Sequence, residues 1–164
     1  STTVATASVI LGASLLVATP ASAEERICRG TIGAVTLDNV KVPSGATCTL
    51  KGTRVKGNIV VNSKATLRAN GAVVNGNIQS EGHRLVVVNN TRVGGSIQLK
   101  QGGGLTVSAN KVEGDVQIFS NKSGTKTIRN NRIDGNLQCK SNTPAPIGSG
   151  NVVDGNKEDQ CRRL

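Results

Sequence analysis

The tetrapeptide Val55-Lys56-Gly57-Asn58 returns along this chain at an almost constant interval. Related tetrapeptides begin at Val74, Val93, Val112, Ile133 and Val153. Their glycines stand at positions 57, 76, 95, 114, 135 and 155, so the successive steps are 19, 19, 19, 21 and 20 residues. A unit this short cannot bury a core alone, and its regular recurrence predicts a repeat architecture in which successive units stack.

Apolar residues form columns when the repeats are aligned on these glycines. Two positions after the glycine stand Ile59, Ile78, Ile97, Val116 and Leu137, and four positions after it stand Val61, Ser80, Leu99, Ile118 and Cys139. A spacing of two is typical of β-strands, and Gly and Asn between them favour tight corners. We therefore expect an all-β fold, a right-handed single-stranded parallel β-helix (a β-solenoid). It should have three short strands per coil and about six or seven coils. The right-handed sense is expected because parallel crossover connections are usually right-handed.

Two polar columns accompany the apolar ones. The position after each glycine holds Asn58, Asn77, Ser96, Asp115, Asn136 and Asn156. We expect these side chains to form a structural ladder that hydrogen-bonds the next coil. An outward column holds Lys41, Val60, Gln79, Gln98, Gln117 and Gln138. Its glutamines are expected to bond one another as an amide ladder, although they would also suit sugar hydroxyls.

The beginning of the chain differs from the repeats. Residues 4–18 are small or aliphatic, and Ala21-Ser22-Ala23 is followed by two glutamates. This pattern is typical of a secretory signal peptide with its cleavage site. Residues 1–23 are therefore predicted to be a signal peptide truncated at its start, and residues 24–164 the β-helix domain; a short membrane anchor is the alternative. We expect a secreted protein, extracellular or periplasmic, with no transmembrane segment in the mature chain.

Four cysteines in an exported chain suggest two disulfides. Cys28 and Cys48 are 20 residues apart, and Cys139 and Cys161 are 22 apart, which is about one coil in each case. Adjacent coils lie ~4.8 Å apart, which a disulfide can span. We therefore predict the pairs Cys28–Cys48 and Cys139–Cys161, one at each end. A metal site built from the four cysteines is not expected, because no Cys-x-x-Cys pair exists.

The coil pattern resembles secreted bacterial right-handed parallel β-helix proteins. Its Val-x-Gly-Asn-Ile sequence is also similar to the bactofilin-type polymer-forming domain, over about residues 40–156. The first resemblance implies a rigid rod, and the second implies assembly through the ends. Bactofilins are cytoplasmic and lack disulfides at their ends, so the export signal and the four cysteines depart from that pattern.

The chain is strongly basic, with 20 Lys and Arg against 10 Asp and Glu and a formal net charge of +10. The outward column before each motif reads Arg54, Val73, Arg92, Lys111, Arg132 and Val152, with Arg129 nearby. This column fits a solvated surface that resists aggregation. It also fits a polyanion-binding site at Arg54, Arg92, Lys111, Arg129 and Arg132, whose partner would be an anionic surface polysaccharide. Nucleic acid is not expected, because Tyr and Trp are absent and single-strand binders use aromatic platforms.

Acidic residues collect late in the chain. Glu113, Asp134 and Asp154 precede the glycine on successive repeats. Neighbouring carboxylates can hold Ca²⁺ or act in glycoside hydrolysis. The expected function is a secreted non-enzymatic module, either structural or associated with the cell envelope through an anionic glycan. The alternative is a small polysaccharide-active enzyme or a Ca²⁺-dependent glycan binder that uses the acidic column. We nevertheless expect no catalytic residues and no cofactor. The single histidine, His83, is expected to be a solvent-exposed corner residue.

Overall fold

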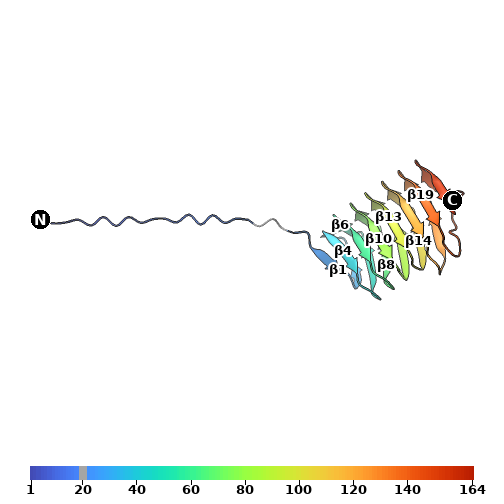
Figure 1. Ribbon diagram of the computed structural model, residues 1–164, viewed down its shortest axis with the longest axis horizontal. Coiled ribbons are helices and arrows are strands. Elements are labelled where there is room, and N and C mark those ends of the chain that lie inside the picture. The colour runs from blue at the N-terminus through green and yellow to red at the C-terminus, as the bar shows by residue number, and fades with distance from the viewer. Residues whose placement is uncertain (19–21) are drawn as a thin grey trace.

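The computed structural model describes residues 1–18 and 22–164 (Figure 1). Residues 1–18 contain no helix or strand. The predicted cleavage motif, Ala21-Ser22-Ala23, begins outside the described residues, so the signal peptide stays a prediction. The first strand, β1, begins at Glu25.

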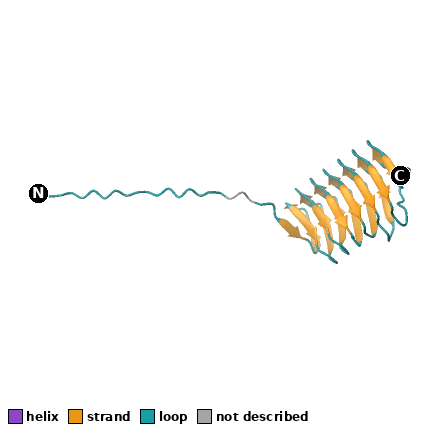
Figure 2. Cartoon of the chain, viewed as in Figure 1, coloured by secondary structure: helices purple, strands orange, loops and turns teal. Residues whose placement is uncertain are grey.

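From Glu25 onward the chain winds into a parallel β-solenoid of about seven turns, with equivalent residues about 19 positions apart (Figure 1). The described residues form strands, turns and loops but no helix (Figure 2). Every strand pairing is parallel, and three sheets run along the solenoid, as the expected three strands per coil require. The predicted architecture is thus confirmed, and its right-handed sense stays a prediction.

Most coils contribute one strand to each of three sheets, which we name A, B and C; the coil of residues 137–156 has no strand in sheet B. Sheet A contains β1 (Glu25–Ile27), β4 (Asn39–Val42), β7 (Ile59–Val61), β10 (Ile78–Glu81), β13 (Ile97–Lys100), β16 (Val116–Phe119), β19 (Leu137–Lys140) and β21 (Lys157–Asp159). Sheet B contains β2 (Gly30–Ile32), β5 (Thr47–Lys51), β8 (Thr66–Asn70), β11 (Leu85–Asn89), β14 (Gly104–Ser108) and β17 (Lys126–Arg129). Sheet C contains β3 (Thr36–Leu37), β6 (Arg54–Val55), β9 (Val73–Val74), β12 (Arg92–Val93), β15 (Lys111–Val112), β18 (Arg132–Ile133) and β20 (Val152–Val153).

The aligned columns lie on successive rungs. Ile78, for example, is in register with Ile59 on one side and Ile97 on the other, and all three are fully buried. Aliphatic side chains of this kind fill the interior, where burial removes apolar surface from water. The longer step between Gly114 and Gly135 is absorbed in a corner, because β16 and β17 are joined by the longer loop 120–125.

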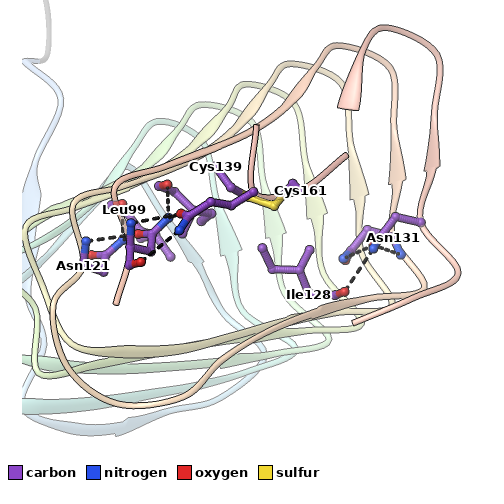
Figure 3. Close-up of a disulfide and its surroundings, with 10 residues drawn as sticks. Leu99, Asn121, Ile128, Asn131, Cys139 and Cys161 are labelled. Carbon is purple, nitrogen blue, oxygen red and sulfur yellow. Dashed lines mark hydrogen bonds between the residues drawn. A yellow bond between two sulfur atoms is a disulfide. The ribbon is translucent and has the colours of Figure 1, made fainter. Parts of the chain in front are cut away.

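Both predicted disulfides are confirmed. Cys28 and Cys48 are joined with a Cα–Cα distance of 5.4 Å, and Cys139 and Cys161 with 5.3 Å. All four residues are buried inside the coils. Figure 3 shows the second disulfide, with Asn121 at one corner of the solenoid and Asn131 at another. The first and last coils are therefore each tied covalently to their neighbours.

The predicted corner ladder is also confirmed. The Asn58 Oδ1 accepts a hydrogen bond from the Asn77 backbone N–H at 2.8 Å, and the Asn77 Oδ1 accepts one from Ser96 N–H at 2.8 Å. The side-chain oxygens of Ser96, Asp115 and Asn136 each accept the equivalent hydrogen bond from the backbone N–H of the ladder residue on the next rung. These side chains satisfy backbone donors at the corner, which is the structural role that we expected.

Two further asparagine ladders are buried at the other corners, and the sequence columns did not predict them. At the corner between sheets B and C, Asn110 Nδ2 donates to the oxygen of Asn131, and Asn131 Nδ2 to that of Asn151, at 3.0 and 2.9 Å. At the corner between sheets A and B, Asn121 Nδ2 donates to Asn142 and to the carbonyl of Leu99, both at 3.0 Å (Figure 3).

The prediction that His83 is exposed is wrong. Only 2% of His83 is accessible, and neither ring nitrogen has a hydrogen-bond partner in the described part of the chain. The side chains of this corner column point into the solenoid. Asn121, which stands two rungs after His83 in the same column, is also buried. On the intervening rung stands Gly102, and a Cβ at that position would collide with the imidazole. The ring therefore occupies interior space that the missing side chain of Gly102 leaves free.

A second unexpected residue is the fully buried Lys126. It lies in register with Leu105, so a lysine occupies an inward column that is otherwise apolar. Its ammonium donates to the carbonyls of Ser123, Gly124 and Thr143 at 2.9, 2.7 and 3.0 Å. The three N–H groups of the ammonium thus meet three backbone carbonyl oxygens, which compensate the burial of its positive charge. Burial, followed by the nearby Lys122, lowers the pKa of Lys126.

Candidate functional site

The predicted cationic column lies on the outward face of sheet C, where Val73 interrupts it and Val152 follows its last cation. Each strand of this sheet is two residues long, and its second residue points inward, so its first residue points outward. The register brings the outward residues onto consecutive rungs in the order Arg54, Val73, Arg92, Lys111, Arg132 and Val152. Neighbouring rungs lie ~4.8 Å apart. We call Arg54, Arg92, Lys111 and Arg132 the basic stripe.

Arg129 does not belong to this column. It ends β17 in sheet B, where it is in register with Ser108, and the corner at residues 130–131 separates it from Arg132. Its side chain is exposed. The structure thus brings four of the five predicted residues together and places the fifth on the neighbouring face.

The two halves of the stripe differ in how their charge is compensated. Lys111 Nζ lies 3.8 Å from Asp134 Oδ2, and Arg132 Nη2 lies 3.7 Å from Asp154 Oδ2, each across one rung. Within residues 22–164, Arg54 and Arg92 have no carboxylate within 4.0 Å. The positive potential should therefore be greatest over the early half of the stripe.

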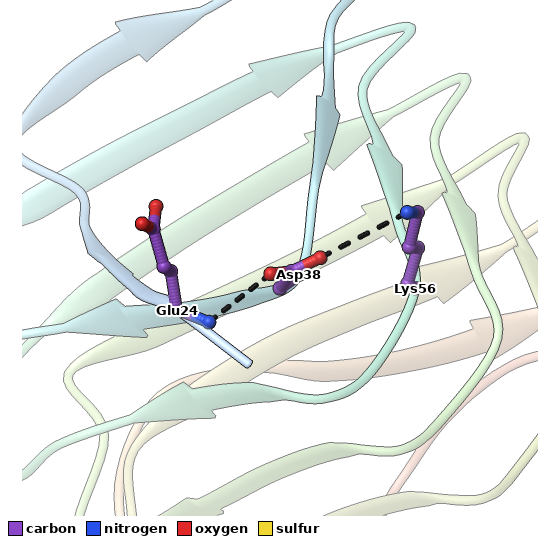
Figure 4. Close-up of polar contacts among 3 residues, drawn as sticks. All are labelled: Glu24, Asp38 and Lys56. Atoms are coloured by element: carbon purple, nitrogen blue, oxygen red, sulfur yellow. Dashed lines mark hydrogen bonds and ion pairs between the residues drawn. The ribbon is translucent and has the colours of Figure 1, made fainter. Parts of the chain in front are cut away.

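The acidic column runs beside the stripe and begins earlier than the sequence suggested. Asp38 stands in it on an early rung, where its Oδ1 is 4.0 Å from Lys56 Nζ and its Oδ2 accepts from the backbone N–H of Glu24 at 3.1 Å (Figure 4). Asp134 and Asp154 are ion-paired as described above. Among the described residues, no group of three or more His, Cys, Asp and Glu side chains is arranged to hold a metal ion.

A shallow depression of about 390 Å³ lies beside Arg92 on the corner between sheets B and C. Gly71 leaves it open because it has no side chain, Ala72 and Val73 contribute small side chains, and Arg92 and Lys111 contribute cations. Val73 is the short residue between the two free arginines. An anionic group can therefore approach Arg92 closely without displacing a large neighbour.

The predicted glutamine ladder is confirmed on the outward face of sheet A. Gln79 Nε2 donates to Gln98 Oε1 at 3.2 Å, Gln98 to Gln117 at 3.0 Å, and Gln117 to Gln138 at 2.9 Å. The ladder ends where Gln138 Nε2 donates to Glu158 Oε2 at 3.0 Å. Sequence reasoning missed Glu158, although it stands 20 positions after Gln138 and thus one coil further on.

A groove of about 440 Å³ adjoins the free end of this ladder. Its lining includes Val60, Gln79, Glu81, Gln98 and Lys100. The next outward residue in the column of Glu81 and Lys100 is Phe119, the single aromatic residue of the chain. Lys100 Nζ lies 5.6 Å from the centre of its ring.

The part of the chain that the structure describes contains no helix long and apolar enough to cross a membrane. In comparisons with known proteins, the chain matches no family model, and neither a curated protein nor a solved structure is significantly similar to it.

Proposed function

We propose that this chain is a secreted, non-enzymatic β-solenoid that binds an anionic polysaccharide along the basic stripe. The observation that carries the proposal is the register of Arg54, Arg92, Lys111 and Arg132 on one outward column, with no carboxylate within 4.0 Å of the first two in residues 22–164. Arg92, Lys111 and Arg132 stand on consecutive rungs and Arg54 stands two rungs before Arg92. Like charges at these spacings repel one another, and a bound polyanion relieves that repulsion. The net charge of +10 adds long-range attraction for the same partner.

Secretion is supported by the two buried disulfides. Disulfides form and persist in oxidising compartments and are rare in the reducing cytosol. They also suit a solenoid whose terminal coils have a neighbour on one side only.

A polysaccharide fits this stripe better than a nucleic acid does. The chain contains no Tyr or Trp, and proteins that bind single strands stack bases on aromatic side chains. The stripe provides point charges on a flat, regular surface, which suits a polymer whose acidic groups recur at a regular interval.

The alternative function, a small polysaccharide-active enzyme or Ca²⁺-dependent glycan binder, would use the acidic column. Two of its three predicted carboxylates, those of Asp134 and Asp154, already face cations of the stripe. A ligand of the acidic column would have to break both pairs. The geometry therefore favours the basic stripe as the binding surface.

The test is binding to heparin resin, a generic polyanion, at about 50 and about 200 mM salt. We expect retention to fall steeply with salt, because bound cations release counterions. The double variant Arg54→Glu/Arg92→Glu should lose retention. Its matched control, Arg68→Glu/Arg84→Glu, makes the same change in charge at exposed residues away from the stripe and should lose much less.

Unchanged retention in the stripe variant would reject the proposal. Equal losses in both variants would favour the alternative of a generally basic, solvated surface. Release of new reducing ends from an acidic polysaccharide, abolished by Asp134→Asn, would instead support the enzyme.

A further inference from the structure

The glutamine ladder has a fixed direction, and Glu158 sets it. An ionised carboxylate can only accept hydrogen bonds, whereas each glutamine amide can present either its oxygen or its NH₂ group. Gln138 must therefore turn its Nε2 toward Glu158, as the 3.0 Å contact shows. Its Oε1 then faces Gln117 and accepts from it, and the same choice passes along the ladder to Gln98 and Gln79.

The fixed direction leaves an acceptor free at the far end. On the rung before Gln79 the column holds Val60, which has no polar group to offer. Gln79 Oε1 receives no hydrogen bond from any residue that the structure describes, while its Nε2 is used by Gln98. Gln79 is one of the residues that line the 440 Å³ groove of sheet A.

A second acceptor stands two residues further along the same strand. Glu81 also lines the groove, and its carboxylate has no ion-pair partner within residues 22–164. Lys100 is its rung partner by register, yet the Lys100 ammonium lies over the ring of Phe119 instead. Residues two apart on a strand point to the same side, roughly 7 Å from one another. The groove thus combines two free acceptors, one cation and an adjacent aromatic ring.

We propose that this groove is a second binding site, which takes a neutral, extended glycan. Sugar hydroxyls would donate to Gln79 Oε1 and to the Glu81 carboxylate and would accept from Lys100. The site goes beyond the anionic-glycan function, because it lies on another sheet and its ligand carries no charge. Its binding should therefore depend little on salt, unlike binding to the basic stripe.

The regular rungs favour one shape of glycan. An extended β-1,4-linked chain advances by nearly one rung spacing per sugar and presents the same edge at every second sugar, so alternate sugars can meet equivalent positions on alternate rungs of sheet A. A coiled α-1,4-linked chain of the same sugars cannot follow this straight surface. Cellohexaose, which is extended, and maltohexaose, which is coiled, are therefore a matched pair of probes with the same sugar composition.

The experiment is an NMR titration of the side-chain amide signals of the glutamines in the full chain. We expect cellohexaose to shift the signals of Gln79 and Gln98, with a Kd of about a millimolar, at low and high salt alike. Maltohexaose should shift them much less. Glu81→Gln should weaken cellohexaose binding about three- to tenfold, because the amide oxygen still accepts but a hydrogen bond to a neutral acceptor is worth about 1 kcal/mol less than one to a charged acceptor.

The direction of the ladder has its own test. Glu158→Lys replaces an acceptor by a donor, so all four amides should reverse and Gln79 should turn its NH₂ toward the groove. Cellohexaose binding should weaken about threefold or more, although residue 158 stands four rungs from Gln79. The control Glu24→Lys makes the same change in charge at an exposed residue outside the ladder and should leave binding unchanged.

Several results would overturn the proposal: no shift with cellohexaose, shifts centred on sheet C, equal effects of maltohexaose, or an unchanged affinity in both Glu81→Gln and Glu158→Lys. The heparin experiment uses a charged probe and variants on other faces, so either proposal can fail without the other.

Discussion

Arg132 stands one rung before Asp154, and its Nη2 lies 3.7 Å from the Asp154 carboxylate. This pair is half-exposed, so it should contribute less than about 1 kcal/mol to folding. The carboxylate does, however, compete with any anionic ligand for the guanidinium. We therefore predict that Asp154→Asn raises the affinity for heparin about two- to fivefold, the worth of one exposed ion pair, and leaves the free energy of unfolding nearly unchanged.

A matched control for this variant exists on sheet A. Glu25→Gln removes the same charge and frees Lys41, whose Nζ lies 3.7 Å from Glu25. Because Lys41 lies outside the stripe, heparin affinity should rise less than in Asp154→Asn. A loss of binding in Asp154→Asn would contradict the prediction and would mean that the carboxylate itself contacts the ligand, as the Ca²⁺-dependent or enzymatic alternative requires.

The glycines of the repeat motif permit the close approach of successive rungs. A Cβ on Gly95 would lie 2.7 Å from the backbone oxygen of Gly76, which cannot move without disturbing the coil below. We predict that Gly95→Ala lowers the free energy of unfolding by about 1–3 kcal/mol, the usual cost of overpacking, as measured by urea unfolding. A Cβ on Gly33 meets nothing within 4 Å, so Gly33→Ala should be neutral. If the two variants lost equal free energy of unfolding, the close approach of neighbouring rungs would not be the reason for glycine in the motif.

The disulfides should protect the ends of the solenoid more than its middle. In a repeat protein each coil contacts only its neighbours, so damage at one end stays largely local. Replacing Cys139 and Cys161 by serine opens a link between residues 22 positions apart and should cost about 3 kcal/mol. Hydrogen exchange should show lost protection in β21, next to Cys161, while β10 in the middle keeps its protection. A uniform loss over all rungs would instead mean that the solenoid unfolds as one unit.

The periodic features of this protein could be predicted from sequence, because each column repeats one local environment. The stacked strands, the corner ladder of Asn58 and Asn77, and the disulfides all follow from the spacing of about one coil. Ion pairs such as Arg132–Asp154 join two columns, and comparing the charges of neighbouring columns would have suggested them. The direction of the glutamine ladder likewise required Glu158, which lies on the rung after the last glutamine.

Departures from the period could not be predicted in this way. Lys126 occupies an apolar column because the loop carbonyl of Thr143 and two local carbonyls happen to surround its ammonium. His83 is buried because Gly102, on the next rung, has no side chain. Both depend on a neighbour from another coil whose position is fixed only by the folded corner.

The buried histidine predicts how stability depends on pH. Burial is the main reason that the pKa of His83 falls from 6.5 to about 4; nearby Lys126 adds to this, and backbone groups of Gly103 and Gly104 oppose it. Above pH 6.5 the imidazole is neutral in both states, so it adds no pH dependence. Between pH 6.5 and about 4 the unfolded chain binds a proton that the folded chain excludes, so the free energy of unfolding falls as the pH falls, by about 3 kcal/mol in all.

Urea unfolding at about pH 7 and about pH 4.5 measures this fall. His83→Asn should reduce it by most of that amount, because asparagine does not titrate and buried asparagines already occupy equivalent corners at Asn121 and Asn142. The carboxylates titrate in both proteins, so the difference between the variant and the wild type isolates the imidazole. An identical pH dependence in the two would mean that His83 takes up its proton as readily in the folded coil as in the unfolded chain, and hence that the corner beneath Gly102 opens to water.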